Sequence, residues 1–453
     1  MVEKKIIDFR LPNYLTNSAD WNKYRLSYAG GEEYRTKYLQ YFSKREEKSE
    51  FNDRRDMTPI PTFAKAALKE IRNSIFQRLI DVIRKEGSQT YNRAVAGFDM
   101  GVDRRGSSMA AFIGRKVLED LLVIGKVGIF VDAPDTVGDT LADASGFRPY
   151  LYAYPVEKVL SYACADPEAP SEFSSLLLED TDVSYDAHTK LPIEEVSRYR
   201  HLWIADSGKV NVQFYDPGGS PIDRTGAPAG PVELELTRIP FVYLDIGDSL
   251  LKDACEYQIA LLNLVSSDVN YALKANFPFY TEQKDTRNVG AHLKSGANDG
   301  TASTGGQGAS DNESKVGVTQ GRYYPKDFDR PDFINPSSEP LEASMALQMK
   351  FEGDIRRLIN LAVQALSQQQ SAESKTLDNA GLESGLSYIG LVLESAERQV
   401  AEHWAAYEES NPRRRLIPTI KYPDRYSLKS DESRIDEAAK LSEVITEIGR
   451  AHV

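Results

Sequence analysis

Cysteine and histidine are scarce in this sequence. Only two cysteines, Cys164 and Cys255, occur among its 453 residues, which is too few for a disulfide framework or a cysteine-bound zinc ion. The five histidines are scattered, and no two stand at the short spacing of metal ligands. The sequence therefore predicts no metal site and no cofactor, and its cysteine usage is typical of a reducing cytoplasm.

Long hydrophobic runs are also missing. No stretch approaches the ~18 consecutive apolar residues that a membrane-spanning helix requires. The first residues, Met1 to Arg10, are charged and lack the apolar core of a signal peptide. We therefore expect a protein that makes no membrane contact and is assembled in the cytoplasm.

Positive charge is not in excess either. The chain has 55 lysine and arginine residues against 68 aspartate and glutamate residues, and its formal net charge is -13. This balance excludes a uniform basic surface that grips phosphate, but it does not exclude a local basic patch. An acidic protein remains compatible with DNA contact if the DNA has to slide past it.

The length and overall composition are those of a globular protein. Apolar residues make up 41% of the chain and charged residues 27%, so a packed core is expected. At ~150 residues per domain, the length predicts about three domains.

Phosphate-binding loops and clusters of carboxylates are absent from the sequence. The nearest match to a phosphate loop, Gly125-Lys126, is followed by Val127, so it lacks the hydroxyl group that would hold Mg²⁺. Aspartate and glutamate are abundant, but they are spread as on ordinary charged surfaces. The sequence predicts no catalytic residue of these types.

One four-residue match points to an enzyme. Gly247-Asp248-Ser249-Leu250 follows a short apolar run and resembles the nucleophile block of the GDSL esterases, in which the serine needs a histidine base. In that family the block is N-terminal and the base belongs to a late Asp-x-x-His. Here the block is mid-chain, and no later histidine has an aspartate three residues before it. We therefore interpret Asp248 and Ser249 as a helix cap, and a GDSL-type esterase is the weaker alternative.

The first half of the chain mixes helical and strand patterns. Helices are expected over residues 14–55, in short pieces, and over 62–85 and 107–124, because apolar or aromatic residues recur at helical spacing. Strands are expected over 127–132, 150–154 and 198–245, with a hairpin turn at Asp206-Ser-Gly208. These patterns predict an α+β fold.

Three long helical patterns dominate the second half. They cover residues 248–276, 338–365 and 379–409. A mixed strand and loop segment separates the first two, and its stretch 295–315 is rich in Gly, Ser, Asn and Asp. The polar tract Ser367 to Lys375 separates the second helix from the third. A strand over 417–422 and a helix over 431–449 are expected at the end of the sequence.

This order of elements resembles that of the portal proteins of tailed double-stranded DNA bacteriophages. In that family, an α+β wing leads into a stem helix, a clip domain is inserted, and a second stem helix returns. A tunnel loop, a long tunnel helix and a crown follow. The patterns Trp21-x-x-x-Arg25, Arg54-Arg55 and Phe76-Gln-Arg78 are similar to the opening of one portal subgroup.

The resemblance implies a division of the chain into portal domains. These are 1–246 as the first part of an α/β wing, 247–276 as stem helix 1, 277–337 as an inserted α/β clip, 338–365 as stem helix 2, 366–378 as the tunnel loop, 379–430 as the tunnel helix and the return to the wing, and 431–453 as the start of a helical crown. Because the last segment is short, the crown is expected to be short, missing or truncated.

Two sets of contact residues are implied by the same resemblance. The tunnel loop of the DNA channel would contain Ser367, Gln368, Gln369, Gln370, Ser371, Glu373, Ser374 and Lys375. These side chains offer weak hydrogen bonds and little net charge. The clip would contact the packaging motor and the tail adaptor through Lys284, Arg287, Lys294 and Lys315.

The implied function is structural rather than enzymatic. About twelve copies would assemble in the host cytoplasm into a ring at one capsid vertex of the virion. Double-stranded DNA would be packaged and ejected through the ring, which would contact the terminase, the major capsid protein and the head–tail adaptor. The alternative is a poreless head–tail adaptor or scaffold-type oligomer, which differs from a portal in ring size and pore width.

Overall fold

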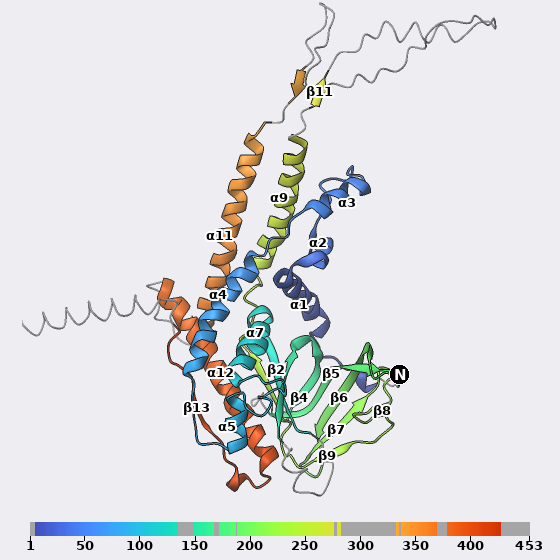
Figure 1. Cartoon of the computed structure of the whole chain (residues 1–453), viewed down its shortest axis with the longest axis vertical. Helices are drawn as coiled ribbons and strands as arrows, with labels where there is room; N and C mark the ends of the chain where they lie inside the picture. The colour runs from blue at the N-terminus through green and yellow to red at the C-terminus, as the bar shows by residue number, and fades with distance from the viewer. Residues whose placement is uncertain are drawn as a thin grey trace, which may run out of the picture. The chain divides into compact units, whose positions relative to one another are not determined.

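The computed structural model describes residues 5–134, 148–166, 172–186, 188–275, 279–281, 332–334, 337–368 and 378–426. These residues form helices and antiparallel sheets, as expected of an α+β protein (Figure 1). They divide into two compact units. The first contains the described residues of 1–46, 59–263 and 349–453, and the second contains those of 47–58 and 264–348.

Short helices begin the first unit, as the aromatic spacing predicted. A 3₁₀ turn at Ile6–Asp8 precedes α1 (Tyr14–Ala29) and α2 (Gly31–Tyr38). Trp21 and Tyr34 are buried, so aromatic side chains at helical spacing anchor both helices to the unit.

Helix α4 (Phe63–Arg78) buries the apolar stripe that the sequence predicted, but it ends earlier than expected. A 3₁₀ turn at Leu79–Asp81 follows it, and strand β1 (Ile83–Lys85) then begins. β1 pairs with β13 (Thr419–Lys421). A helix extending to Lys85 was therefore a wrong prediction, because pairing with a distant strand outweighs the local helical pattern here.

The helix expected over 107–124 is continuous but irregular. It consists of α6 (Met109–Phe112), a π-helical turn (Ile113–Val117) and α7 (Leu118–Ile124). The hydroxyl of Ser108 accepts a hydrogen bond from the amide of Ala111 and so caps this helix. A short helix before it, α5 (Gln89–Val95), was not expected from the sequence.

A three-stranded sheet follows α7. Its order is β10 (Phe241–Asp245), β2 (Lys126–Asp132) and β3 (Tyr150–Pro155). All three strands were expected. β2 is the central strand and is buried along nearly its whole length, which explains its continuous apolar run.

The second sheet of the first unit has six strands. It contains β4 (Val159–Cys164), β5 (Phe173–Tyr185), β6 (Pro192–Ile204), β7 (Val210–Tyr215), β8 (Pro221–Ile222) and β9 (Val232–Leu234). The turn at Asp206-Ser-Gly208 joins β6 to β7, as predicted. β4 and β5 were not expected. A 3₁₀ turn at Val156–Lys158 connects β3 to β4.

One hydrophobic cluster contains side chains from both sheets. Phe130, Tyr154 and Phe241 come from the three-stranded sheet, and Leu178 and Leu202 come from the six-stranded sheet. The two sheets therefore share one core, which fixes their inner faces relative to each other.

Three long helices follow the sheets. They are α9 (Ala254–Ala275), α11 (Glu339–Gln368) and α12 (Asp378–Glu408), with 22, 30 and 31 residues. α11 and α12 lie close to their expected boundaries, whereas α9 begins later than expected. A 3₁₀ turn at Pro412–Arg414 follows α12. Among the described residues, no helix combines the length and hydrophobicity that would let it cross a membrane.

The second unit contains α3 (Lys48–Met57), the end of α9 and the beginning of α11. It also contains β11 (Phe279–Thr281) and β12 (Asp332–Ile334), which pair with each other. The buried Arg54 on α3 donates from Nη1 to Ser266 Oγ of α9 at 2.7 Å. Thr58 donates to the same oxygen at 2.8 Å.

Candidate functional site

The resemblance described above implied that the helices corresponding to α9 and α11 form a pair, with the second returning along the first. In the first unit, Tyr257 of α9 meets Phe351 of α11 with ring centroids 5.5 Å apart. In the second unit, Gln348 donates a hydrogen bond to Asp268, and the Tyr271 hydroxyl donates to the carbonyl oxygen of Ser337. These contacts make the two helices antiparallel neighbours within each unit.

Helix α12 packs closely against α11 in the first unit. At Gly385, an added β-carbon would lie 2.0 Å from the Val363 carbonyl oxygen, so only glycine allows the two backbones to come this close. At Gly390, an added β-carbon would lie 2.4 Å from the ring of Tyr426. The glycines of the third long helix are therefore contact points.

The described residues include only the edge of the predicted tunnel loop. Ser367 lies in the last turn of α11, where its hydroxyl donates to the carbonyl oxygen of Gln364 at 2.8 Å. Gln368 is the last residue of that helix. The remaining predicted positions lie outside the described residues. They are Gln369, Gln370, Ser371, Glu373, Ser374 and Lys375 in the loop, Lys284, Arg287, Lys294 and Lys315 in the clip, and 431–453 in the crown.

The portal-like opening motifs make structural contacts. Arg25 on α1 donates from Nε to Glu157 at 2.7 Å and also bonds Asp120. The ring of Phe76 fills the space where Gly114 lacks a side chain. These residues therefore hold the helices of the first unit together.

The serine of the GDSL-like block also has a structural role. Ser249 is buried; its Oγ donates to the carbonyl oxygen of Val123 at 2.5 Å and accepts from the amide of Leu251 at 2.9 Å. It caps the turn before α9 rather than α9 itself, which explains why that helix starts late. Neither described hydrogen bond of this hydroxyl involves a histidine.

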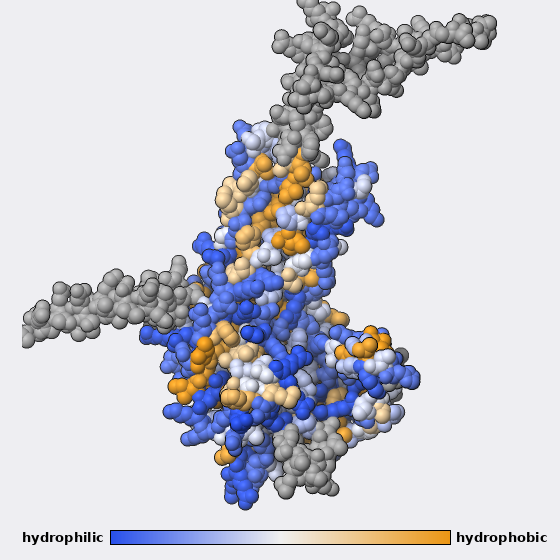
Figure 2. Space-filling view, in the orientation of Figure 1, coloured by the Kyte–Doolittle hydropathy of each residue, from blue (hydrophilic) through white to orange (hydrophobic). Residues whose placement is uncertain are grey.

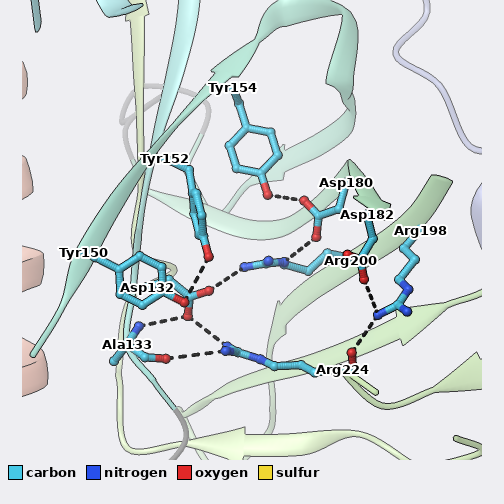
Figure 3. A network of polar contacts seen from close by, with 10 residues as sticks. All are labelled: Asp132, Ala133, Tyr150, Tyr152, Tyr154, Asp180, Asp182, Arg198, Arg200 and Arg224. Carbon is cyan, nitrogen blue, oxygen red and sulfur yellow. Dashed lines mark hydrogen bonds and ion pairs between the residues drawn. The ribbon is translucent and has the colours of Figure 1, made fainter. Parts of the chain in front are cut away.

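A charged cavity of about 410 Å³ lies between the two sheets (Figure 3). Successive side chains of a strand point to opposite faces, so the even-numbered residues of β5 and β6 share the inner face. Leu176, Leu178 and Leu202 on that face belong to the core. Farther along the same face, the side chains become charged and line the cavity: Asp180, Asp182, Arg198 and Arg200.

Arg200 is the centre of the polar network. Only 7% of the residue is exposed, and its guanidinium lies over the rings of Phe130 and Phe214 at 4.7 and 5.0 Å. Its Nε donates to Asp180 at 3.0 Å, and its Nη1 donates to Asp132 at 3.1 Å. Arg200 therefore bridges the two carboxylates and compensates part of their negative charge.

Two further arginines extend the network. Arg224 Nη2 donates to Asp132 Oδ1 at 2.9 Å, and the amide of Ala133 donates to the same oxygen at 2.9 Å. Arg198 forms an ion pair with Asp182 at 2.9 Å. The network thus joins the end of β2 to β5, β6 and the loop after β8.

Tyrosines of β3 form the opposite side of the cavity. The Tyr154 hydroxyl donates to Asp180, and the Tyr152 hydroxyl donates to Tyr150 at 2.9 Å. Burial raises the pKa of Tyr154 and of Tyr152, so both hydroxyls stay protonated donors.

A second buried cluster lies on α12. Glu397 has a fully buried side chain that accepts bonds from Arg84 Nε at 2.5 Å and Nη2 at 2.9 Å. It also accepts from the hydroxyls of Tyr91, at 3.2 Å, and Tyr422, at 2.6 Å. The four bonds attach β1, α5 and the segment after β13 to the helix.

Neither cluster was predicted from the sequence. The alternation of Asp180, Asp182, Arg198 and Arg200 along their strands has the same period as a solvated face. The sequence of β5 did contain one indication that this face is internal: Leu176 and Leu178 precede Asp180 and Asp182 on the same face. Opposite charges at facing positions of one hairpin indicate pairing rather than repulsion.

The described residues contain no group of three or more His, Cys, Asp or Glu that could hold a metal ion. In sequence comparisons, no protein-family model and no curated protein matches the chain.

Proposed function

We propose that the chain is a subunit of a portal-type ring, a non-enzymatic channel for double-stranded DNA at one capsid vertex. The observation that carries this proposal is the arrangement of the long helices. Strands β11 and β12 pair with each other, so the segment after α9 and the segment before α11 meet at one place. An insert that leaves and returns between two antiparallel helices matches the clip between two stem helices.

Exposed apolar side chains on the long helices support the proposal. In the second unit, Leu273 of α9 and Met345 and Leu347 of α11 are 38%, 54% and 38% exposed. Figure 2 shows apolar side chains over α9 and α11. A head-to-tail interface between identical copies closes into a ring when its rotation fits. We expect these side chains to be covered by a neighbouring copy.

The expected partners follow from the same proposal. The clip, with Lys284, Arg287, Lys294 and Lys315, would meet the terminase and then the head–tail adaptor. The wing would meet the major capsid protein. The tunnel loop around Ser367 to Lys375 would border the DNA path, and the ring would reside at the portal vertex of the virion after assembly in the host cytoplasm.

Electron microscopy of the purified protein, with its mass measured by light scattering, tests the proposal. We expect rings of about twelve subunits with a hole that admits a duplex. A small poreless oligomer would instead favour a head–tail adaptor or scaffold-type protein, and a monomer at high protein concentration would also count against a portal.

A matched pair of variants locates the interface. Met345→Glu combined with Leu347→Glu places charge at two exposed apolar positions of α11 and is expected to abolish ring formation while leaving the circular dichroism spectrum unchanged. Leu15→Glu changes a side chain that is 78% exposed on α1 and is expected to leave the rings intact. Equal loss of rings in both would contradict the assignment of the interface.

A further inference from the structure

Among the three aspartates and the two arginines of the network that lines the cavity, the polar atoms without a hydrogen bond or ion pair are arginine donors. Each carboxylate oxygen of Asp132, Asp180 and Asp182 already accepts at least one hydrogen bond or ion pair. By contrast, Arg200 uses Nε and Nη1, and Arg198 uses Nη1. Within the described part of the chain, Arg200 Nη2 and Arg198 Nε and Nη2 make no hydrogen bond. The cavity therefore favours a ligand that brings acceptor oxygens.

The charge of the lining limits how negative that ligand is. Four cationic side chains line the cavity, namely Lys158, Arg198, Arg200 and Arg224. Four carboxylates oppose them, namely Asp132, Glu179, Asp180 and Asp182. Since these charges balance, a dianion would be poorly compensated at this depth, whereas a single negative charge held by guanidinium N–H groups is compatible with the site.

The two sides of the cavity differ in chemistry. Residues of β5 and β6 supply the charged side, whereas Tyr152, Ala153 and Pro155 of β3 supply a largely apolar side. Figure 3 shows Tyr152 and the charged side chains. The Tyr152 residue remains 39% exposed although its ring lies beside the buried network. An exposed ring at a cavity wall is a surface on which a flat apolar group can stack. A cavity of about 410 Å³ is in the size range of small-molecule sites.

We propose that this cavity binds a small molecule in which a singly charged oxyanion, either a carboxylate or a phosphodiester, is joined to a flat apolar group. The oxyanion accepts hydrogen bonds from Arg198 and Arg200, and the flat group lies against Tyr152. This site is independent of ring formation, because every residue that forms it belongs to one chain and to the first unit.

Calorimetric titration of the full chain at low ionic strength tests the site with three ring-bearing probes. Benzoate supplies a carboxylate, cyclic AMP supplies a phosphodiester, and benzylamine supplies a cation. We expect benzoate or cyclic AMP to bind with about millimolar affinity or tighter, and benzylamine to bind at least about tenfold more weakly. The stronger of the two anions identifies the oxyanion. Equal binding of all three probes, or no binding of either anion at ~10 mM, would overturn the proposal.

Two arginines of similar exposure provide the variant and its control. Arg198, with 22% of its side chain exposed, pairs with Asp182 at 2.9 Å, and Arg72, with 24% exposed, pairs with Glu119 at 2.7 Å. Arg198→Gln is expected to weaken binding of the anion about tenfold, which corresponds to ~1.4 kcal/mol. Arg72→Gln is expected to leave binding unchanged, and equal effects in both would overturn the proposal.

Arg198→Lys keeps the positive charge but loses the planar fork, so weakened binding in this variant separates oriented hydrogen bonding from simple charge.

Discussion

Two clusters of buried charge in the first unit differ in what they leave unsatisfied. Around Glu397, one fully buried carboxylate accepts four hydrogen bonds from Arg84, Tyr91 and Tyr422. Around Arg200, the aspartates are also paired, but guanidinium N–H groups remain free beside a cavity of about 410 Å³. We call the Glu397 cluster closed, because its carboxylate is fully hydrogen-bonded, and the Arg200 cluster open, because it has free N–H groups beside a cavity. A closed cluster serves to hold elements together, whereas an open one retains the capacity to bind a ligand.

The closed cluster shows how α12 is held in the first unit. Its partners come from β1, from α5 and from the residue after β13, which are far apart in the sequence but meet at one carboxylate. Breaking a buried pair costs much more than the pair contributes relative to an apolar replacement, because the remaining charge is left without a partner. Loss of a single member should therefore loosen several elements at once.

The largest expected effect is that of Glu397→Ala. This change leaves the partly buried guanidinium of Arg84 and two buried tyrosine hydroxyls without their acceptor, so we expect a loss of about 4 kcal/mol in the free energy of unfolding. Denaturant titration followed by circular dichroism measures it. Glu402→Ala is the control, because Glu402 lies on the same helix, is 45% exposed and contacts Arg238 at 3.4 Å. Its expected cost is below about 0.5 kcal/mol, and equal losses in the two variants would contradict the closed-cluster interpretation.

A smaller effect is expected when Arg200 is changed to Met. Asp132 retains Arg224 and the amide of Ala133, and Asp180 retains Tyr154, so the loss should be about 2 kcal/mol in the same denaturant titration. Adding Asp180→Asn to this variant removes the carboxylate that has lost its cationic partner. We expect the double variant to be more stable than Arg200→Met alone. If it is less stable, the uncompensated charge of Asp180 does not explain the cost.

The comparison also shows which features the sequence allowed us to predict. The apolar stripe of α4, the strands β2, β3 and β10, and the long helices α11 and α12 follow local periodicity and were placed nearly correctly. β1 was read as helix because its partner strand is β13, at the other end of the chain. Pairings of this kind depend on tertiary contacts that no local pattern contains.

Both charged clusters were missed for the same physical reason. Arg84 and Glu397 are 313 residues apart, so nothing in the local sequence relates them. Asp180 and Arg200 alternate with other residues as on an exposed strand face, and only the facing sheet makes that face internal. The predicted tunnel loop and clip residues, apart from Ser367 and Gln368, lie outside the described residues and stay predictions.

His403 is a buried side chain of α12 that becomes charged only when it takes up a proton. Burial, together with repulsion from Arg238 and Arg415, lowers the pKa of His403 to about 3. The unfolded chain binds a proton below about pH 6.5, whereas the folded chain does not until about pH 3, so stability is full above pH 6.5 and is lost as the pH falls. This group alone should cost up to ~2 kcal/mol between pH 6.5 and pH 5.

His403→Gln tests that pH dependence. We expect the variant to lose less stability than the unmodified chain between pH 7 and pH 5, measured as the shift in the denaturant midpoint. Glu402, the neighbouring residue, is the same in both proteins, so it does not explain a difference between them. Parallel pH profiles would show that the buried imidazole contributes nothing to the acid sensitivity of α12.

The smallest expected effect concerns Ser249, a buried polar group without charge. Ser249→Ala removes the bonds to the carbonyl oxygen of Val123 and the amide of Leu251, so we expect a loss of about 1 kcal/mol in the free energy of unfolding. Ser74→Ala is the control, because the Ser74 hydroxyl donates to the carbonyl oxygen of Glu70 at an exposed position and its loss should cost little.

Hydrolysis of p-nitrophenyl acetate is measured in parallel. Unchanged hydrolysis together with lower stability would leave Ser249 as a satisfied structural hydroxyl, comparable to the closed cluster but without charge. Loss of a measurable hydrolytic activity in Ser249→Ala alone would instead support the alternative that the chain is a GDSL-type esterase.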